Sequence, residues 1–508
     1  MEQLSGFESF VLYSEQGNLF SHVAALGIYD PSTAAGGKVR FKDVLRHLRN
    51  RLHVHPLFTR RLAAVPYGLD RPYWIDDAEV DIDFHVRQLA LPQPGDWRQL
   101  MIQVARLHSR PLDRSRPLWE VYVIERLAGI PHVPPGAFAM FVKFHHASVD
   151  GMAAMQVIRD LHGATADAQP PRKERPASGA AAPDEPALDA SVLSHGVGRL
   201  VELSRFSVAA ARKVSGLAVD RILRGRTGEG GADSRLPLPA FSRAPATRFN
   251  APISANRAVE AIGVPIAAMK PIRAAVDGAT INDIFLAVAG GAVRRYLAAK
   301  GELPDRSLVA LMPVSVRSET RAGSNEVGGI PVPVRSDIAD PLARLRAVHD
   351  AANAAKRQAD LLGRDLVQQV FESVPHRVAS WFMRGVVMPQ LNLTVSNVRG
   401  PDAPLYAAGA RLARLYPVSM PADDVGLNLT GVSFDGVLWI SAVACRNMMP
   451  DPAFFADCLR ASVAELEAAA ASARAGVRAP SKRETDLCAP QARPRQSRTP
   501  RRRKASGD

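Results

Sequence analysis

Apolar and polar positions divide the first third of the chain into alternating runs of strand and helix character. Residues 22–30, HVAALGIYD, form an apolar run of strand length. Residues 38–52 and 96–112 instead repeat their apolar positions at helical spacing. Two more apolar runs, at 117–127 and 136–144, are joined by a segment rich in proline and glycine, which predicts a pair of strands. We therefore expect this part of the chain to form an α/β unit.

The second of these paired strands leads directly into HHASVDG, residues 145–151, after which helical spacing returns. Proteins of this class commonly keep catalytic groups on the loops that follow strands. A histidine placed there acts as a general base near neutral pH, because its ordinary pKa is about 6.5. His146 and Asp150 are spaced so that a carboxylate can orient the imidazole, and Gly151 leaves room for a close approach. The alternative is a structural turn whose histidines are hydrogen-bonded in the core.

The same alternation of strand and helix patterns returns near residue 247. A long helical run occupies residues 279–301. Apolar strands are predicted at 307–317 and 391–401, and a hairpin with Asp-Gly at its turn is predicted at 425–444. The second part of the chain is therefore expected to be another α/β unit of similar architecture.

These patterns divide the chain into an N-terminal domain at 1–167 and a C-terminal domain at 247–473. Residues 168–246 between them begin as a linker rich in proline and alanine and continue as a basic amphipathic helix. Residues 474–508 are expected to be a disordered basic tail, since they hold 11 Lys/Arg against 3 Asp/Glu and so +8 of the net charge of +14. The tail has no interleaved aromatic residues, so anionic lipid is a better partner for it than any specific nucleic acid.

Cysteine usage and hydropathy indicate the compartment. The three cysteines have no CxxC spacing, the N-terminus has no signal-peptide pattern, and no apolar run approaches about 18 residues. We expect a cytoplasmic protein that touches a membrane or a lipid inclusion only peripherally. Neither an HExxH motif nor a third clustered ligand accompanies the adjacent histidines, so no metal site is expected.

HHASVDG matches the HHxxxDG signature of the superfamily that contains CoA-dependent acyltransferases and condensation domains. Further segments, in order along the chain, resemble the bacterial wax ester synthase/acyl-CoA:diacylglycerol acyltransferase family in particular. They are SRPLWEVYVIE (115–125), TRFNAPIS (247–254), ATINDIFLAVAGGAVRRYL (279–297), LMPVSVR (311–317), LTVSNVRGP (393–401) and the stretch 415–443. Within this match, the PLWE stretch at 117–120 is more consistent with a structural role than with a catalytic one.

The resemblance implies two sandwich-like α/β domains side by side, with an active-site channel between them that admits acyl-CoA and acceptor from opposite ends. By the same resemblance His146 is the general base and His145 shapes the site. Asp150 holds the site through a salt bridge, which argues against the simple His146–Asp150 dyad, and Gly151 keeps the channel open.

The implied reaction is transfer of a fatty acyl group from acyl-CoA to diacylglycerol, to a long-chain fatty alcohol, or to both, without a covalent intermediate. Acyl-CoA is then a substrate, and no cofactor is expected. Asn282 is a candidate donor to the oxyanion, with a helix N-cap as its alternative role. Ser315 and Arg317 are candidate substrate-binding residues, and Arg317 would pair with Asp150 or with a CoA phosphate. Competing hypotheses are an amide-forming condensation enzyme and a non-catalytic lipid-surface protein.

Overall fold

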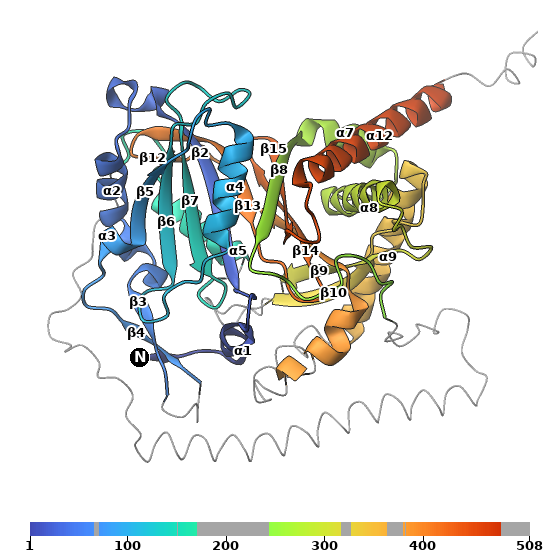
Figure 1. Cartoon of the computed structure of the whole chain (residues 1–508). Helices are drawn as coiled ribbons and strands as arrows, with labels where there is room; N and C mark the ends of the chain where they lie inside the picture. Colours follow the sequence, from blue (N-terminus) through green and yellow to red (C-terminus); the bar gives the residue numbers. More distant parts are fainter. Residues whose placement is uncertain are drawn as a thin grey trace, which may run out of the picture.

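The computed structural model describes residues 1–65, 71–149, 151–169, 243–315, 327–362, 379–381 and 383–478. These residues form two six-stranded sheets, one small three-stranded sheet and the helices that cover them (Figure 1). The predicted basic helix and nearly all of the linker lie outside the described residues, as does the tail from residue 479 onward.

The first large sheet has the strand order β12-β13-β2-β7-β6-β5 and is antiparallel except between β5 and β6. Its strands are β2 (His22–Asp30), β5 (Val86–Ala90), β6 (Trp119–Glu125), β7 (Phe138–His145), β12 (Tyr406–Ala407) and β13 (Ala410–Val418). The associated helices are α1 (Gly6–Ser14), α2 (Phe41–Arg49), α3 (Ile82–His85), α4 (Trp97–His108) and α5 (Gly151–Leu161). The predicted strand at 22–30, the strand pair that precedes the histidines and the helix that follows them are confirmed.

The second large sheet has the order β10-β9-β11-β14-β15-β8. Its strands are β8 (Arg257–Pro265), β9 (Val309–Ser315), β10 (Val327–Pro333), β11 (Leu393–Arg399), β14 (Leu427–Phe434) and β15 (Val437–Cys445). The helices that pack with it are α7 (Ile266–Ala274), α8 (Ile281–Ala299), α9 (Pro341–Leu362) and α12 (Pro452–Arg478). The predicted hairpin is confirmed as β14 and β15, which pair antiparallel across Asp435 and Gly436.

The two sheets exchange strands between the halves of the chain. β11 and β14 are parallel neighbours, so the chain between them must make a crossover, because a tight turn joins only antiparallel strands. That crossover carries β12 and β13 into the first sheet, where β13 pairs antiparallel with β2. A division of the chain at a single boundary near residue 247 therefore does not describe the sheets, since residues 406–418 complete the sheet of the first half.

Helix α8 is the centre of the second core. From Ile284 to Val293 its residues are apolar on every side, which is typical of a buried helix, and this stretch is inaccessible to solvent. Two glycines allow this packing. A Cβ atom added to Gly290 would lie 1.9 Å from the carbonyl oxygen of Val334, and one added to Gly291 would lie 2.1 Å from Oγ of Ser462 on α12.

A third, small sheet is formed by three strands from the first 76 residues of the chain. It has the order β1 (Glu2–Gln3), β4 (Tyr73–Asp76) and β3 (Arg60–Ala63). With α1 it builds a separate apolar cluster whose buried members are Leu4, Val11, Leu12 and Ala147. Ala147 belongs to the histidine turn, so α1 packs directly against that turn. Throughout the described ranges, no helix has the length and apolarity needed to cross a bilayer.

Candidate active site

The histidine turn leaves the end of β7 and is held by backbone hydrogen bonds to its two neighbouring strands. The amide of His145 donates to the carbonyl of Leu118 at 3.1 Å, beside the start of β6, and the amide of His146 donates to the carbonyl of Ser21 at 2.7 Å, beside the start of β2. The turn closes with Ser148, whose amide donates to the carbonyl of His145 at 3.0 Å. Both imidazoles are thus placed from a rigid strand end, as the sequence predicted.

His145 is 1% exposed, and both of its ring nitrogens have partners. The amide of Ala147 donates to Nδ1 at 3.0 Å, and Nε2 lies 3.1 Å from Oε1 of Glu15. Because an N–H group points at Nδ1, that nitrogen must accept, so the proton is on Nε2 and is donated to the carboxylate. His145 is therefore fixed in one tautomer and is not available as a base, in agreement with a site-shaping role.

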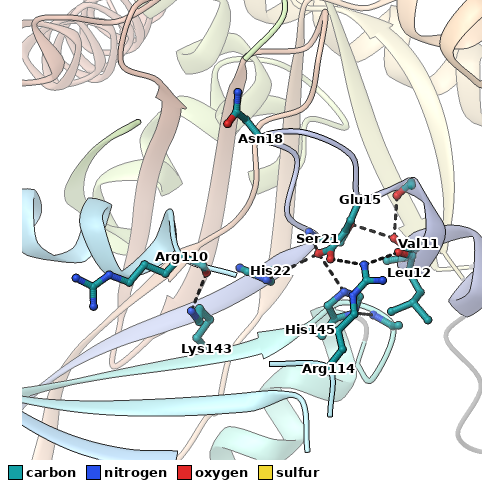
Figure 2. Close-up of polar contacts among 12 residues, drawn as sticks. Val11, Leu12, Glu15, Asn18, Ser21, His22, Arg110, Arg114, Lys143 and His145 are labelled. Carbon is teal, nitrogen blue, oxygen red and sulfur yellow. Dashed lines mark hydrogen bonds and ion pairs between the residues drawn. The ribbon is translucent and has the colours of Figure 1, made fainter. Parts of the chain in front are cut away.

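Glu15 is the anchor of this arrangement, and sequence reasoning missed it. It follows α1 directly, and its carboxylate also accepts from the backbone amide of Ser21 at 2.5 Å and from Nη2 of Arg114 at 2.6 Å (Figure 2). Burial alone would raise the pKa of Glu15, but the hydrogen bonds from His145, Arg114 and Ser21 outweigh it, so the pKa is lower than its ordinary value. Glu15 is ionised at neutral pH. No local motif distinguishes this residue, since its main partner is 130 positions away.

His146 is half-buried, in contrast to its neighbour. Its ring lies edge-on to Phe7 of α1, with 6.5 Å between ring centroids. The turn therefore holds one histidine locked in the interior and a second that remains partly accessible beside α1. Of the two, His146 is the more exposed.

The strand that carries the histidines also contains a buried ion pair. Lys143 is 0% exposed and its Nζ lies 2.9 Å from Oε2 of Glu120 on β6. Nζ also donates to the carbonyl of Arg110 at 3.0 Å (Figure 2). It donates to the carbonyl of Leu107 at 3.3 Å as well, so hydrogen bonds within the protein replace those that the buried ammonium would make with water. Glu120 is the acid of the PLWE stretch, which agrees with a structural role for that motif.

Two further buried histidines lie close to this centre. His22 packs against His108 and His145, with ring centroids 6.4 and 6.1 Å away. Burial, together with the positive charge of Lys143, lowers the pKa of His22 well below its ordinary value. Burial and the nearby Arg257 and Lys143 lower the pKa of His108 to about 3. Both rings are neutral at physiological pH.

Asn282 lies in the first turn of α8, but it is not the N-cap. Thr280 occupies that position and forms a capping box with Asp283, so the N-cap interpretation of Asn282 is wrong. The Asn282 amide instead donates to Sδ of Met312 on β9 at 3.2 Å. A thioether is a weak acceptor, which leaves this amide suitable for a stronger one. Asp283 also accepts from Nδ1 of His349 on α9 at 2.9 Å, so the start of α8 is fixed from two sides.

Of the remaining predicted site residues, the structure describes Gly151 and Ser315 but not Asp150 and Arg317. A Cβ atom on Gly151 would lie 3.3 Å from Cγ2 of Val398 on β11, so glycine lets the start of α5 approach the second sheet closely. Ser315 is the last residue of β9 and pairs with Val327. Asp150 and Arg317 lie outside the described residues, so their predicted salt bridge and phosphate contact stay predictions. Across the described ranges, no three His, Cys, Asp or Glu side chains are grouped to hold a metal ion.

The architecture of two six-stranded sheets covered by helices also occurs in condensation domains. The first condensation domain of the calcium-dependent antibiotic synthetase superimposes with a TM-score of 0.54 over 92% of this chain and 97% of its own, at 15% sequence identity. This likeness shows the fold alone.

Sequence relationships narrow the class. The family models for the wax ester synthase/diacylglycerol acyltransferase catalytic domain and for the WS/DGAT C-terminal domain match residues 4–285 and 323–467. A probable diacylglycerol O-acyltransferase of Mycobacterium tuberculosis, tgs2, is 33% identical over 490 residues, covering 92% of this chain and 99% of that protein. The solved wax ester synthase/diacylglycerol acyltransferase from Marinobacter aquaeolei VT8 superimposes with a TM-score of 0.65 at 26% identity, covering 92% and 100% of the two chains. The chain belongs to the wax ester synthase/diacylglycerol acyltransferase family. The predicted family and two-domain α/β fold are confirmed.

Proposed function

We propose that this protein transfers a fatty acyl group from acyl-CoA to the hydroxyl group of diacylglycerol or a long-chain alcohol, forming triacylglycerol or wax ester. The observation that carries the mechanism is the division of roles within the histidine turn. Both nitrogens of His145 are occupied by Ala147 and Glu15, so His146 is the remaining base. Family membership and the names of its relatives support the substrate classes.

The reaction needs a single base and no covalent enzyme intermediate. His146 removes the proton from the acceptor hydroxyl while the oxygen attacks the thioester carbonyl. The resulting tetrahedral oxyanion requires a hydrogen-bond donor, which we assign to Asn282. The C–S bond then breaks, and the imidazolium returns its proton to the departing thiolate of CoA. The ester and free CoA are the products.

The competing hypotheses are weaker. An amide-forming condensation enzyme shares the fold, but the likeness to condensation domains is at 15% identity, whereas the diacylglycerol O-acyltransferase relatives are 33% identical over nearly the whole chain. A non-catalytic lipid-surface protein would not need an accessible histidine beside a locked one.

Because the proposed acceptors are water-insoluble, we also propose that the protein works in peripheral contact with a membrane or a lipid inclusion.

The test is release of the CoA thiol from palmitoyl-CoA, with diacylglycerol or hexadecanol as acceptor. His146→Ala is expected to lower acceptor-dependent release by about 10²–10⁴-fold, the usual contribution of a general base. The control is His132→Asn, since His132 is exposed in a loop with a φ of 58° that asparagine tolerates. Wild-type rates in the His146 variant would refute the assignment.

A further inference from the structure

A polar hollow of about 570 Å³ lies between the end of α1 and three residues from the second half of the chain, Ser380, Trp381 and Arg384. Figure 1 shows α1 beside the orange segment that contains them, at the lower side of the molecule. The residues that give the hollow its chemistry are Glu15, Gln16, Arg114, Trp381 and Arg384. No residue singled out for catalysis lines it, so it is a feature additional to the histidine turn.

The charge of the hollow is positive, with two guanidinium groups against one carboxylate. Arg384 donates through Nη1 to the side-chain oxygen of Gln16 at 3.1 Å and through Nη2 to the carbonyl of Ser14 at 3.3 Å. Both acceptors are uncharged, and among the residues that the structure describes no ion pair neutralises Arg384. These bonds hold the guanidinium in place and leave its charge available to an anion.

The second arginine is only partly compensated. Arg114 donates to Glu15 and also to the carbonyl of Leu12 at 2.8 Å, but the carboxylate of Glu15 is shared with His145 and Ser21. A planar guanidinium is the side chain best suited to bind phosphate, through paired N–H groups. The wall of the hollow therefore favours a phosphorylated ligand.

Trp381 adds an aromatic surface beside these arginines. Its side chain is 70% exposed, which is unusual for the largest of the apolar side chains. An indole ring of this kind offers a flat face on which a purine base stacks. An aromatic face beside two phosphate-binding groups matches the chemistry of a nucleotide.

The hollow also adjoins the reaction centre. Its wall residue Glu15 contacts His145 at 3.1 Å, and His145 precedes the proposed base in the chain. A fatty acyl chain needs an apolar, enclosed channel, so this polar and open hollow is unsuited to it. A charged, water-soluble group is the kind of ligand that fits this hollow.

We propose that this hollow binds the phosphorylated adenosine end of acyl-CoA, with Arg384 and Arg114 on the phosphates and Trp381 on the adenine. The proposal rests on the proposed function, in which acyl-CoA is the donor. It assigns a place to the nucleotide and makes Arg384 and Trp381 determinants of donor affinity that take no part in bond making.

The first experiment measures binding without turnover. Calorimetric titration with adenosine 3′,5′-bisphosphate is expected to show binding to the wild type, and binding about 10- to 100-fold weaker to Arg384→Gln and Trp381→Ala. The control is Arg46→Gln, which removes an exposed arginine of α2 outside the hollow. Unchanged affinity in both hollow variants would overturn the proposal, and so would an equal loss in the control.

The second experiment compares donors with and without the nucleotide. For palmitoyl-CoA, Arg384→Gln is expected to raise KM by about tenfold with kcat nearly unchanged, as expected for loss of uniform binding. For palmitoyl-pantetheine, which lacks the nucleotide, the same variant should match the wild type. Equal effects on the two donors would overturn the nucleotide assignment while leaving the proposed function intact.

Two other results have defined meanings. If the wild type transfers no acyl group from either donor, the proposed function fails, whereas the calorimetric result still decides whether the hollow binds nucleotide. If Arg384→Gln weakens binding to phosphatidylglycerol vesicles but not to adenosine 3′,5′-bisphosphate, the hollow serves an anionic lipid headgroup and the nucleotide proposal is overturned.

Discussion

Glu15 and His145 are 130 positions apart in the chain, yet Oε1 of the carboxylate and Nε2 of the imidazole lie 3.1 Å apart. The contact joins the end of α1 to the end of β7 and fixes the tautomer of the histidine beside the proposed base. It also gives the N-terminal helix a defined role, because α1 supplies the aromatic ring against which His146 packs and the residue that caps its C-terminal end supplies the carboxylate.

Replacing Glu15 by glutamine is expected to lower kcat by about tenfold at saturating acyl-CoA. Glutamine keeps the shape of the side chain but cannot satisfy Ser21, Arg114 and His145 as the carboxylate does, so the turn loses its fixed geometry. Steady-state kinetics with separate kcat and KM values measure this. A rise in KM with kcat unchanged would show that Glu15 acts on binding and does not position the turn.

Substitution of Asn282 by alanine separates its two predicted roles. Since Thr280 is the N-cap, the variant should unfold within a few degrees of the wild type. Loss of an oxyanion donor is expected to lower kcat by about 10²–10³-fold. Thiol-release kinetics and a thermal melt on the same sample give both values. A lowered melting temperature with retained activity would show that Asn282 has a structural role and not a catalytic one.

Lys143→Met is expected to destabilise the protein by about 3 kcal/mol, because it leaves the buried carboxylate of Glu120 without its cation. The double variant Lys143→Met/Glu120→Gln should lose less than the sum of the two single variants. Denaturant unfolding of all four proteins completes a double-mutant cycle. Additive losses would show that the two side chains do not interact.

Gly290→Ala should lower the melting temperature, since its Cβ atom would lie 1.9 Å from the backbone oxygen of Val334. Overpacking of this kind costs about 1–3 kcal/mol, or more where the neighbour is backbone. The control is Gly385→Ala, because a Cβ atom there has no heavy atom within 4 Å. Equal melting temperatures for the two variants would contradict the packing of α8.

The buried neutral His108 predicts sensitivity to acid. Its pKa is lowered from 6.5 to about 3 in the folded protein, so the unfolded chain binds a proton that the folded protein does not. The contribution of His108 to the free energy of unfolding is therefore fully present above pH 6.5 and is lost progressively as the pH falls from 6.5 toward 3. His108→Phe removes this proton uptake, and its melting temperature should fall less than that of the wild type between pH 6.5 and pH 4. Parallel pH profiles would show that His108 does not contribute.

Local patterns of apolar and polar residues predicted many of the helices and strands of this architecture. Helical spacing predicted α4, α5 and α8, and the apolar run before HHASVDG predicted the strand that delivers His145 and His146. The stretch Thr280–Asp283 was ambiguous, because threonine and asparagine both cap helices and only the backbone shows which one does.

Features that depend on distant contacts could not be predicted in this way. Neither Glu15 nor the pair Lys143–Glu120 has a local signature, since each acquires its role from a partner on another element. The sequence also does not show that residues 406–418 join the first sheet. Alternating apolar and polar residues identify a strand but not the sheet to which the strand belongs.

That crossing also has a consequence for synthesis. Until the ribosome has delivered residue 418, β2 has no β13 beside it and presents an open edge with unpaired backbone groups. The first six-stranded sheet therefore cannot be completed while the N-terminal half of the chain leaves the ribosome. Its strand β13 is synthesised some 380 residues after β2. A fragment that stops before this strand is expected to expose that edge and to aggregate, so the two halves of the chain form one folding unit.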